Sequence, residues 1–157
     1  MKFQFWSVGK THEPYIKAGV ENFTGRIAKY YPVDWNIIGP PKNAGLLGEM
    51  ELKKKEADIL LAGISKDDFV VALDERGKSL SSEQLAAFIQ ARANESTRQL
   101  IFLVGGAYGL HQTVLERANY KWSLSLLTFP HQLVRLILAE QVYRACTIIR
   151  NEKYHHQ

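Results

Sequence analysis

The sequence has 157 residues, of which 46% are hydrophobic and 23% charged, proportions typical of a soluble globular domain. No apolar run reaches the roughly 20 residues that span a membrane, and the single cysteine excludes an internal disulfide or a thiolate metal cluster. Lysine and arginine number 20 against 16 acidic residues, so the net charge of +4 permits a polyanionic partner such as RNA without requiring one.

Apolar segments typical of strands alternate with helical segments along the whole chain. The expected strands are residues 3–8, 33–38, 69–73, 100–104 and 122–127. The expected helices follow them at residues 14–31, 44–63, 82–95, 110–119 and 131–150. This alternation predicts one α/β domain over residues 1–157 with a mostly parallel sheet. The apolar stretch at the start of the sequence is too short and too polar for a signal peptide, so we expect a cytoplasmic protein.

Two local signals sharpen the expected elements. The segments FVVAL and LIFLV are continuously apolar rather than alternating, which is typical of strands buried on both faces. Ser81 and Gln84 stand three residues apart before the helix at 82–95, where a serine and a glutamine can satisfy each other's backbone N–H groups. The sequence therefore predicts a central sheet covered on both sides and a capping box at residue 81.

The last expected helix carries apolar residues on both halves of its helical wheel. One half holds Leu133, Val134, Ile137, Leu138, Val142, Ala145, Ile148 and Ile149, with Gln141 among them. The other half holds Leu136, Ala139, Tyr143 and Cys146, beside Arg135, Glu140 and Arg150. One half can face the sheet, and a second copy of the chain is the simplest cover for the other. A homodimer is therefore expected, although an exposed leucine and tyrosine would also fit.

Several familiar site patterns are absent from the sequence. The glycine-rich turn at 105–109 follows the fourth expected strand and lacks the dinucleotide spacing, so it serves either a ligand or a tight turn. Gly77 and Lys78 do not complete a P-loop, because Ala72 occupies the required glycine position. The five histidines show no metal-ligand spacing, and we expect no metal.

The segment SLSLLTFPHQ, residues 123–132, raises a different question, because an apolar run meets a helix with no polar loop between them. Turns in water usually carry Gly, Asn, Asp or Ser. A connection built from Leu126, Leu127, Thr128 and Phe129 must be covered by other chain or wrapped around an apolar ligand. The basic, aromatic tail near Tyr154 and His155 is either frayed or suited to contact phosphate and bases.

Together, GGAYGL at 105–110, SLSLLTFPHQLVRLILAEQVYRA at 123–145 and the terminal KYHH resemble the small bacterial SPOUT-type methyltransferases of the ribosomal RNA large subunit methyltransferase H group. The resemblance covers the whole chain. It implies a C-terminal trefoil knot, a homodimer, S-adenosylmethionine as methyl donor, and N3 of a pseudouridine in 23S ribosomal RNA as acceptor. It also explains the apolar turn, which would be threaded through the knot and wrapped around the cofactor.

The resemblance also implies the residues of the site. The cofactor residues would be Leu73, Gly105, Leu124, Ser125, Leu126, Leu127, Thr128 and Phe129. His131 and Tyr154 would bind the RNA. His155 suits the removal of the acceptor proton by its residue type, and Arg144 suits the stabilisation of the resulting anion. Two other classes stay open, a non-catalytic RNA- or ribosome-binding protein and a nucleotide-binding oxidoreductase or kinase-like enzyme.

Overall fold

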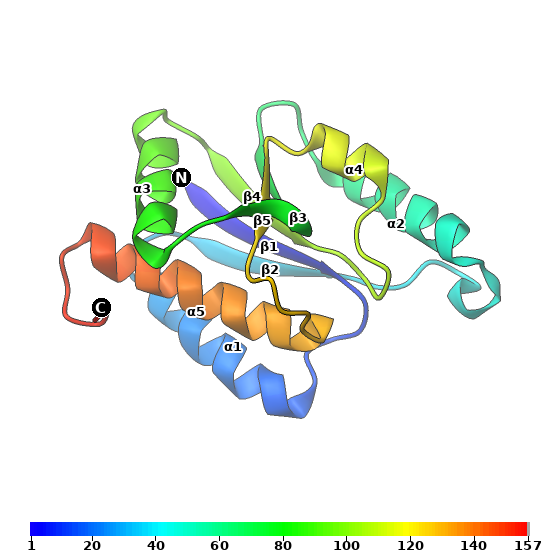
Figure 1. The fold of residues 1–157 in the computed structure, drawn as a ribbon, viewed down its shortest axis with the longest axis horizontal. Coiled ribbons are helices and arrows are strands. Elements are labelled where there is room, and N and C mark those ends of the chain that lie inside the picture. Colours follow the sequence, from blue (N-terminus) through cyan, green and yellow to red (C-terminus); the bar gives the residue numbers. More distant parts are fainter. Residues whose placement is uncertain (157) are drawn as a thin grey trace.

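The computed structural model describes residues 1–156 and contains a sheet with helices on both faces (Figure 1). The strands are β1 (Lys2–Val8), β2 (Val33–Ile38), β3 (Phe69–Ser79), β4 (Gln99–Val104) and β5 (Tyr120–Ser123). The helices are α1 (Pro14–Ile27), α2 (Glu49–Gly63), α3 (Ser82–Asn94), α4 (Gln112–Arg117) and α5 (His131–Ile149), with a short 3-10 turn, η1, at Ala44–Leu46. No helix described over residues 1–156 is long and apolar enough to cross a membrane.

The sheet has the order β2-β1-β4-β3-β5, and its paired strands all run parallel. The predicted α/β class with a parallel sheet is therefore confirmed. The carboxyl ends of β1, β4, β3 and β5 consequently meet at one edge of the sheet. Ligands of open α/β sheets bind outside this edge.

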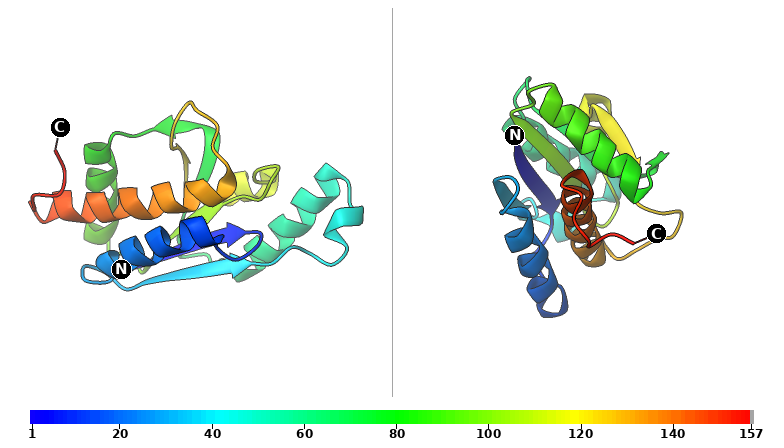
Figure 2. Two further views of the ribbon diagram at one scale, coloured as in Figure 1. Left: turned by 90° about the horizontal axis from the view of Figure 1, so that it is seen from below. Right: turned by 90° about the vertical axis from the view of Figure 1, so that its left-hand side faces the viewer.

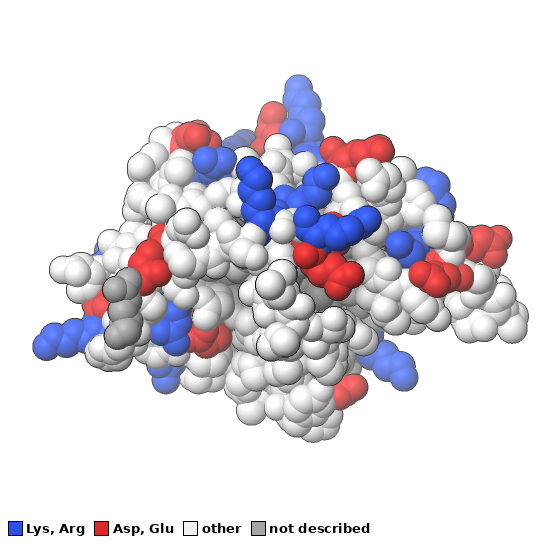
Figure 3. Space-filling view, in the orientation of Figure 1, with Lys and Arg blue, Asp and Glu red and all other residues white. Residues whose placement is uncertain are grey.

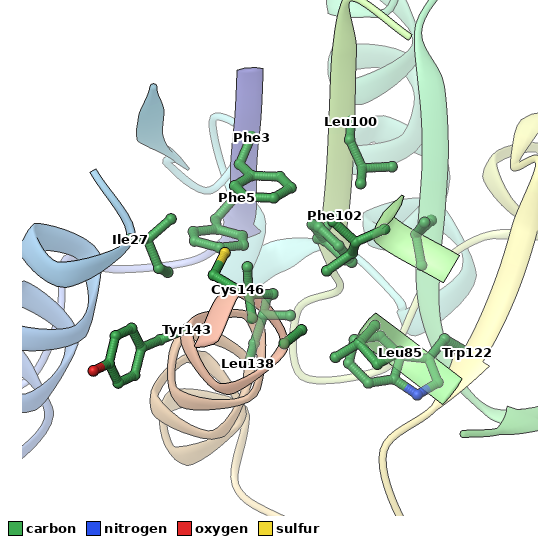
Figure 4. Close-up of a cluster of buried hydrophobic side chains, with 14 of the residues drawn as sticks. Phe3, Phe5, Ile27, Leu85, Leu100, Phe102, Trp122, Leu138, Tyr143 and Cys146 are labelled. Carbon is green, nitrogen blue, oxygen red and sulfur yellow. The ribbon is translucent and has the colours of Figure 1, made fainter. Parts of the chain in front are cut away.

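Both faces of the sheet are buried, as the continuous apolar strands predict. On one face, α1, α3 and α5 pack against alternate residues such as Phe5 and Phe102 (Figure 4). On the other face, α2 and α4 cover the intervening residues, including Trp6 and Leu103. Figures 1 and 2 show α1 and α5 lying side by side, and residues of both helices belong to the core cluster of Phe5 and Phe102. The predicted capping box is also present, since Ser81 Oγ accepts from the Gln84 backbone and Gln84 Oε1 accepts from the Ser81 backbone.

Several predicted boundaries are wrong, and local contacts explain the differences. The last strand covers 120–123 instead of 122–127, because Asn119 bonds both backbone groups of Val70 and starts the pairing with β3 early. β3 continues to Ser79 beyond the expected 69–73, after an irregular stretch that interrupts its pairing with β5. Gly48 separates η1 from α2, so the helix expected at 44–63 is shorter.

The half of the α5 helical wheel that carries Leu136, Ala139, Tyr143 and Cys146 is covered within the chain. The sequence argument for a homodimer depended on this half being uncovered, so that argument no longer applies. A Cβ atom built on Gly19 of α1 would lie 2.6 Å from Leu136 Cδ1, so the two helices pack closely there. Tyr143 contacts Phe23 and Tyr30, and Cys146 is buried. The trefoil knot and the single domain over residues 1–157 stay predictions, and Gln157 lies outside the described residues.

Candidate active site

A cavity opens at the carboxyl edge of the sheet, between residues 73–75 in the middle of β3, the end of β4, the segment after β5 and the start of α5. It is lined by Leu73, Asp74, Glu75, Val104, Gly105, Gly106, Gly109, Trp122, Ser123, Leu124, Ser125, Leu127, Thr128, Phe129, His131 and Val134. The apolar part of this wall comes from leucine, valine, tryptophan and phenylalanine side chains, and the polar part comes from Asp74, Glu75, Ser123, Ser125, Thr128 and His131. Such a cavity suits a small ligand with an apolar ring and polar edges.

The cavity gathers nearly all of the residues expected to bind the cofactor. Leu73 reaches it from β3, Gly105 from the turn after β4, and Leu124, Ser125, Leu127, Thr128 and Phe129 from the segment after β5. His131, expected to bind RNA, also lines it at the first turn of α5. Leu126 is not among the lining residues and is 95% exposed. The structure thus brings together residues that lie more than 50 positions apart in the sequence.

Two serine hydroxyls allow the apolar segment after β5 to turn without polar loop residues. Ser123 Oγ donates to the backbone oxygen of Ser125 at 3.0 Å, and Ser125 Oγ accepts from the backbone N–H of Leu127 at 3.0 Å. Pro130 then supplies the N-cap of α5. Side-chain hydroxyls therefore satisfy backbone groups that water would otherwise contact.

The glycine-rich turn after β4 is closed tightly on itself. The backbone N–H of Gly109 donates to Gly106 at 3.0 Å, and Gly109 has a φ of +82°. A Cβ atom built on Gly105 would lie 2.7 Å from the carbonyl carbon of Gly109. Glycine at 105 is therefore required by the turn that forms one wall of the cavity, and not only by the approach of a ligand.

A second polar cluster lies at the other end of α5, where the C-terminal tail folds back. Glu140 Oε1 accepts from Arg144 Nε at 3.0 Å, from Arg144 Nη2 at 2.5 Å and from the Tyr154 hydroxyl at 3.0 Å. His155 Nε2 lies 2.7 Å from Glu83 Oε1, and His155 Nδ1 lies 3.1 Å from Arg144 Nη1. The tail is thus docked on α3 and α5 and is not frayed.

In these contacts the polar groups of Arg144, Tyr154 and His155 already have partners. The guanidinium of Arg144 stacks on the Tyr154 ring at 4.7 Å and is paired with a carboxylate. Burial, together with the hydrogen bond to Glu140, raises the pKa of the Tyr154 phenol, which therefore stays protonated at neutral pH. Both ring nitrogens of His155 already have partners, so the ring can take a proton from a substrate only after one contact opens.

The cavity and the tail cluster are far apart within one chain. His131 and Arg144 lie on the same helix, and at roughly 1.5 Å per residue they are about 20 Å apart along its axis. In a single copy of the chain, the expected cofactor residues and His131 therefore form one group, and Arg144, Tyr154 and His155 form another.

Comparison with known proteins identifies the family. The family model described as predicted SPOUT methyltransferase matches residues 1–155. Ribosomal RNA large subunit methyltransferase H of Cytophaga hutchinsonii is 44% identical over 156 residues, which cover 99% of this chain and 100% of the relative. The protein of the same name from Flavobacterium johnsoniae is 40% identical over 157 residues, and the alignment covers 100% of both chains. The chain belongs to the SPOUT methyltransferase family.

The solved structures agree with this assignment at the level of the fold. A probable methylase family protein from Haemophilus influenzae Rd KW20 superimposes with a TM-score of 0.57 at 12% identity, covering 99% of this chain and 70% of that one. The family resemblance inferred from the sequence motifs is confirmed by the family model and the full-length relatives. Among residues 1–156 of this SPOUT methyltransferase, no group of three His, Cys, Asp or Glu side chains is placed to hold a metal ion.

Sequence reasoning did not identify Glu56, which lies behind the glycine-rich turn of the SPOUT methyltransferase. Its side chain is buried on α2, and a Cβ atom built on Gly106 would lie 3.0 Å from Glu56 Oε2. Burial raises the pKa of this carboxyl group above its ordinary value. The only sequence signal is that Glu56 precedes the buried Leu60 by one helical turn and so shares its face.

We expect Glu56→Gln to stabilise the protein at neutral pH, because glutamine removes the cost of ionising this buried carboxyl group. Because the pKa is raised in the folded state, the native protein binds the proton more tightly than the unfolded chain does. The wild type therefore loses stability as the pH rises above 4.5, the ordinary pKa of a glutamate, and through the higher pKa of the folded state. Glutamine lacks this penalty, so thermal unfolding should show a gain at pH 7 that disappears below pH 4. An equal gain at both pH values would contradict the prediction.

Proposed function

We propose that this SPOUT methyltransferase transfers the methyl group of S-adenosylmethionine to N3 of a pseudouridine in 23S ribosomal RNA, in the cytoplasm. The observation that carries the proposal is the cavity at the carboxyl edge of the sheet, closed by the glycine-rich turn and the apolar segment 124–129. The names of the relatives support ribosomal RNA as the substrate.

The lining of the cavity fits S-adenosylmethionine. Leu124, Leu127 and Phe129 offer an apolar slot for the adenine ring, while the backbone of the glycine-rich turn offers polar groups to its edge. Within residues 1–156 there is no P-loop or dinucleotide turn to favour ATP or NAD. When bound, the cofactor supplies a methyl group already activated on a sulfonium. The protein then needs no nucleophilic side chain, because alignment of donor and acceptor alone can lower the barrier by roughly 7 to 11 kcal/mol.

The surface beside the cavity suits a polyanion. Lysine and arginine side chains gather over β3 and β5 (Figure 3), where Arg76, Lys78 and Lys121 border one hollow. Arg76 also borders a second hollow, with Lys53 and Tyr108, that shares Leu73, Asp74, Glu75, Gly109 and Phe129 with the cavity, and Arg76 Nε lies 3.5 Å from Asp74 Oδ2. These cations can pair with RNA phosphates at the mouth of the proposed cofactor site.

The proposal includes a homodimer, because one copy separates the two groups of predicted residues. In a symmetric dimer, Arg144, Tyr154 and His155 of one copy could approach the cavity of the other. Leu126 and Leu127 are 95% and 71% exposed on the cavity-forming segment, and such apolar surface is available for a partner. His131 would face the RNA from the cavity itself. The roles of His155 in proton removal and of Arg144 in anion stabilisation stay predictions that require their present contacts to open.

The substrate would be ribosomal RNA within the large subunit or within the assembled ribosome. The test is methyl transfer from labelled S-adenosylmethionine to both kinds of particle, prepared without the modification, followed by mass spectrometry of the digested RNA. We expect one added methyl group on a ring nitrogen of a pseudouridine. Binding to ribosomal particles without transfer would instead support a non-catalytic RNA-binding protein. Titration with NAD and ATP completes the comparison, and tight binding of either would contradict the proposed cofactor.

A further inference from the structure

A second hollow, which we call the outer hollow, adjoins the cavity at the carboxyl edge of the sheet. It is bordered by Lys53, Arg76 and Tyr108, none of which lines the cavity itself. Its volume of about 540 Å³ lies within the range of roughly 300 to 1,000 Å³ that small-ligand sites occupy. Five residues line both spaces, namely Leu73, Asp74, Glu75, Gly109 and Phe129.

The irregular stretch of β3 forms one side of the outer hollow. Leu73 and Lys78 both pair with Trp122 of β5, so residues 74–77 bulge out of the ladder between them. A Cβ atom built on Gly77 would lie 2.6 Å from the backbone of Lys121, so glycine is required where β3 returns to β5. The bulge therefore projects the charged residues 74–76 beside the cavity.

The ring of Tyr108 is available to stack on a ligand in the outer hollow. It is 51% exposed, and its side chain forms no hydrogen bond or ring contact with any residue among 1–156. The glycine-rich turn fixes the backbone on both sides of it, since the Gly109 N–H donates to the Gly106 carbonyl at 3.0 Å. An exposed aromatic ring on a tight turn offers a face on which a nucleobase can stack.

The charged groups of the outer hollow divide into two sets. The carboxylates of Asp74 and Glu75 lie at the boundary with the cavity, because they line both spaces. The cations of Lys53 and Arg76 lie away from this boundary, since they line the outer hollow and not the cavity. Arg76 Nε is 3.5 Å from Asp74 Oδ2, whereas Lys53 forms no ion pair with any described residue. A fitting ligand therefore carries an anion at one end and hydrogen-bond donors at the other.

A nucleotide of the RNA substrate has this polarity. Its phosphate is an anion that lysine and arginine side chains bind. A pseudouridine base carries two N–H groups, at N1 and N3, and carboxylates accept from such donors. Enzymes that act on a base in a nucleic acid take it out of the stack and hold it in a pocket, where aromatic side chains replace the lost stacking.

We propose that the outer hollow binds the target nucleotide, with its base stacked on Tyr108 beside the cavity and its phosphate held by Lys53 and Arg76. This inference rests on the proposed function and adds the side from which the base meets the methyl group. Tyr108 directly precedes Gly109, which lines both spaces, so a base on its ring lies at the boundary with the proposed cofactor site.

Two matched substitutions at Tyr108 test the stack in the full-length protein. We expect Tyr108→Ala to raise the concentration of ribosomal particles that half-saturates single-turnover methyl transfer by about 10- to 100-fold, the loss typical of one removed stacking ring. Tyr108→Phe keeps the ring and should stay within about twofold of wild type. Affinity for S-adenosylmethionine should be unchanged in both, because Tyr108 does not line the cavity. Equal behaviour of the two variants, or a loss confined to cofactor affinity, would overturn the proposal.

Lys53 and Lys54 are neighbours on α2 that test the phosphate contact. Lys53 borders the outer hollow, whereas Lys54 pairs with Asp58 at 2.8 Å. Loss of one phosphate-bound cation should reduce the slope of log affinity for ribosomal particles against log salt concentration by about 0.7. We therefore expect this reduction in Lys53→Gln and none in Lys54→Gln. Identical slopes in the two variants would contradict the proposed phosphate position.

A crosslink identifies the nucleotide that lies on residue 108. Cys146 is the only native cysteine and is buried, so Tyr108→Cys introduces one accessible thiol. A photoreactive maleimide on this thiol should crosslink to the nucleotide that the wild type methylates or to its direct neighbours, as mapped by primer extension. Wild-type protein treated in the same way is the control. Crosslinks only at other sites, or none, would overturn the proposal, whereas a wild type that methylates no pseudouridine would refute the proposed function instead.

Discussion

Substitution of Gly105 by alanine should abolish the binding of S-adenosylmethionine. The added Cβ atom would lie 2.7 Å from the carbonyl carbon and 3.0 Å from the carbonyl oxygen of Gly109. Backbone atoms cannot yield at that distance, so the turn that forms one wall of the cavity must open. We expect at least a 100-fold loss of affinity by calorimetry, equivalent to about 3 kcal/mol. The sheet should persist, because β4 ends before the turn.

Gly106→Ala is the matched control for this prediction. The atoms nearest to its Cβ would be those at the end of the Glu56 side chain, with Oε2 at 3.0 Å, and not backbone atoms. Alanine at 106 should therefore retain affinity within a few-fold, although it stands next to the critical position. Equal loss in both variants would show that any change in the turn is damaging. Unchanged affinity in Gly105→Ala would refute the cavity as the cofactor site.

Most of the sheet could be predicted because its signals are local. Continuous apolar segments such as 100–104 indicate strands covered on both faces, and Ser81 with Gln84 indicates the start of α3. The position of β5 could not be predicted in this way. The side chain of Asn119 bonds to Val70, 49 residues away, and this contact starts the strand two residues early. The composition of residues 124–127 is typical of a strand, but these residues form a turn that is held by hydrogen bonds of the Ser123 and Ser125 hydroxyls.

The candidate site could be predicted only in part, because some of its residues give local signals and others depend on contacts between distant parts of the chain. The composition of segment 124–129 is too apolar for an exposed loop, which predicts a covered or ligand-binding turn. In the structure this segment lines the cavity. The burial of Arg135 on α5 could not be predicted, because its partner Ser7 is 128 residues distant and the helical wheel places it beside Glu140 and Arg150. The helical wheel of α5 also placed Leu136 and Tyr143 on an uncovered face, because a helical wheel cannot show that α1 packs against these residues.

Removal of residues 153–157 should abolish methyl transfer while preserving the cofactor site. The deletion takes away Tyr154 and His155, which hold Arg144 in the tail cluster. We expect a loss of at least 100-fold in single-turnover transfer to ribosomal particles. Affinity for S-adenosylmethionine should stay within about twofold, because the cavity lies at the other end of α5. A modest fall in thermal stability is expected as well, since Tyr154 packs against Tyr143.

His156→Ala is the control for the deletion, because this exposed histidine lies beside the two residues in question without sharing their burial. It should keep nearly full activity. Wild-type turnover of the truncated protein would show that the docked tail serves stability alone. Loss of cofactor affinity in the truncated protein would show that the two ends of α5 are coupled within one chain.

Co-expression of the truncated chain with the Gly105→Ala chain tests whether the tail acts on the partner. Each variant alone should be inactive, one for lack of a tail and the other for lack of cofactor. In a mixed dimer, the intact cavity of the truncated chain would face the intact tail of the other, giving one competent site of two. With random pairing, half of the dimers are mixed, so about a quarter of wild-type activity should return. If tail and cavity instead acted within one chain, neither copy would have both parts, and co-expression would restore nothing.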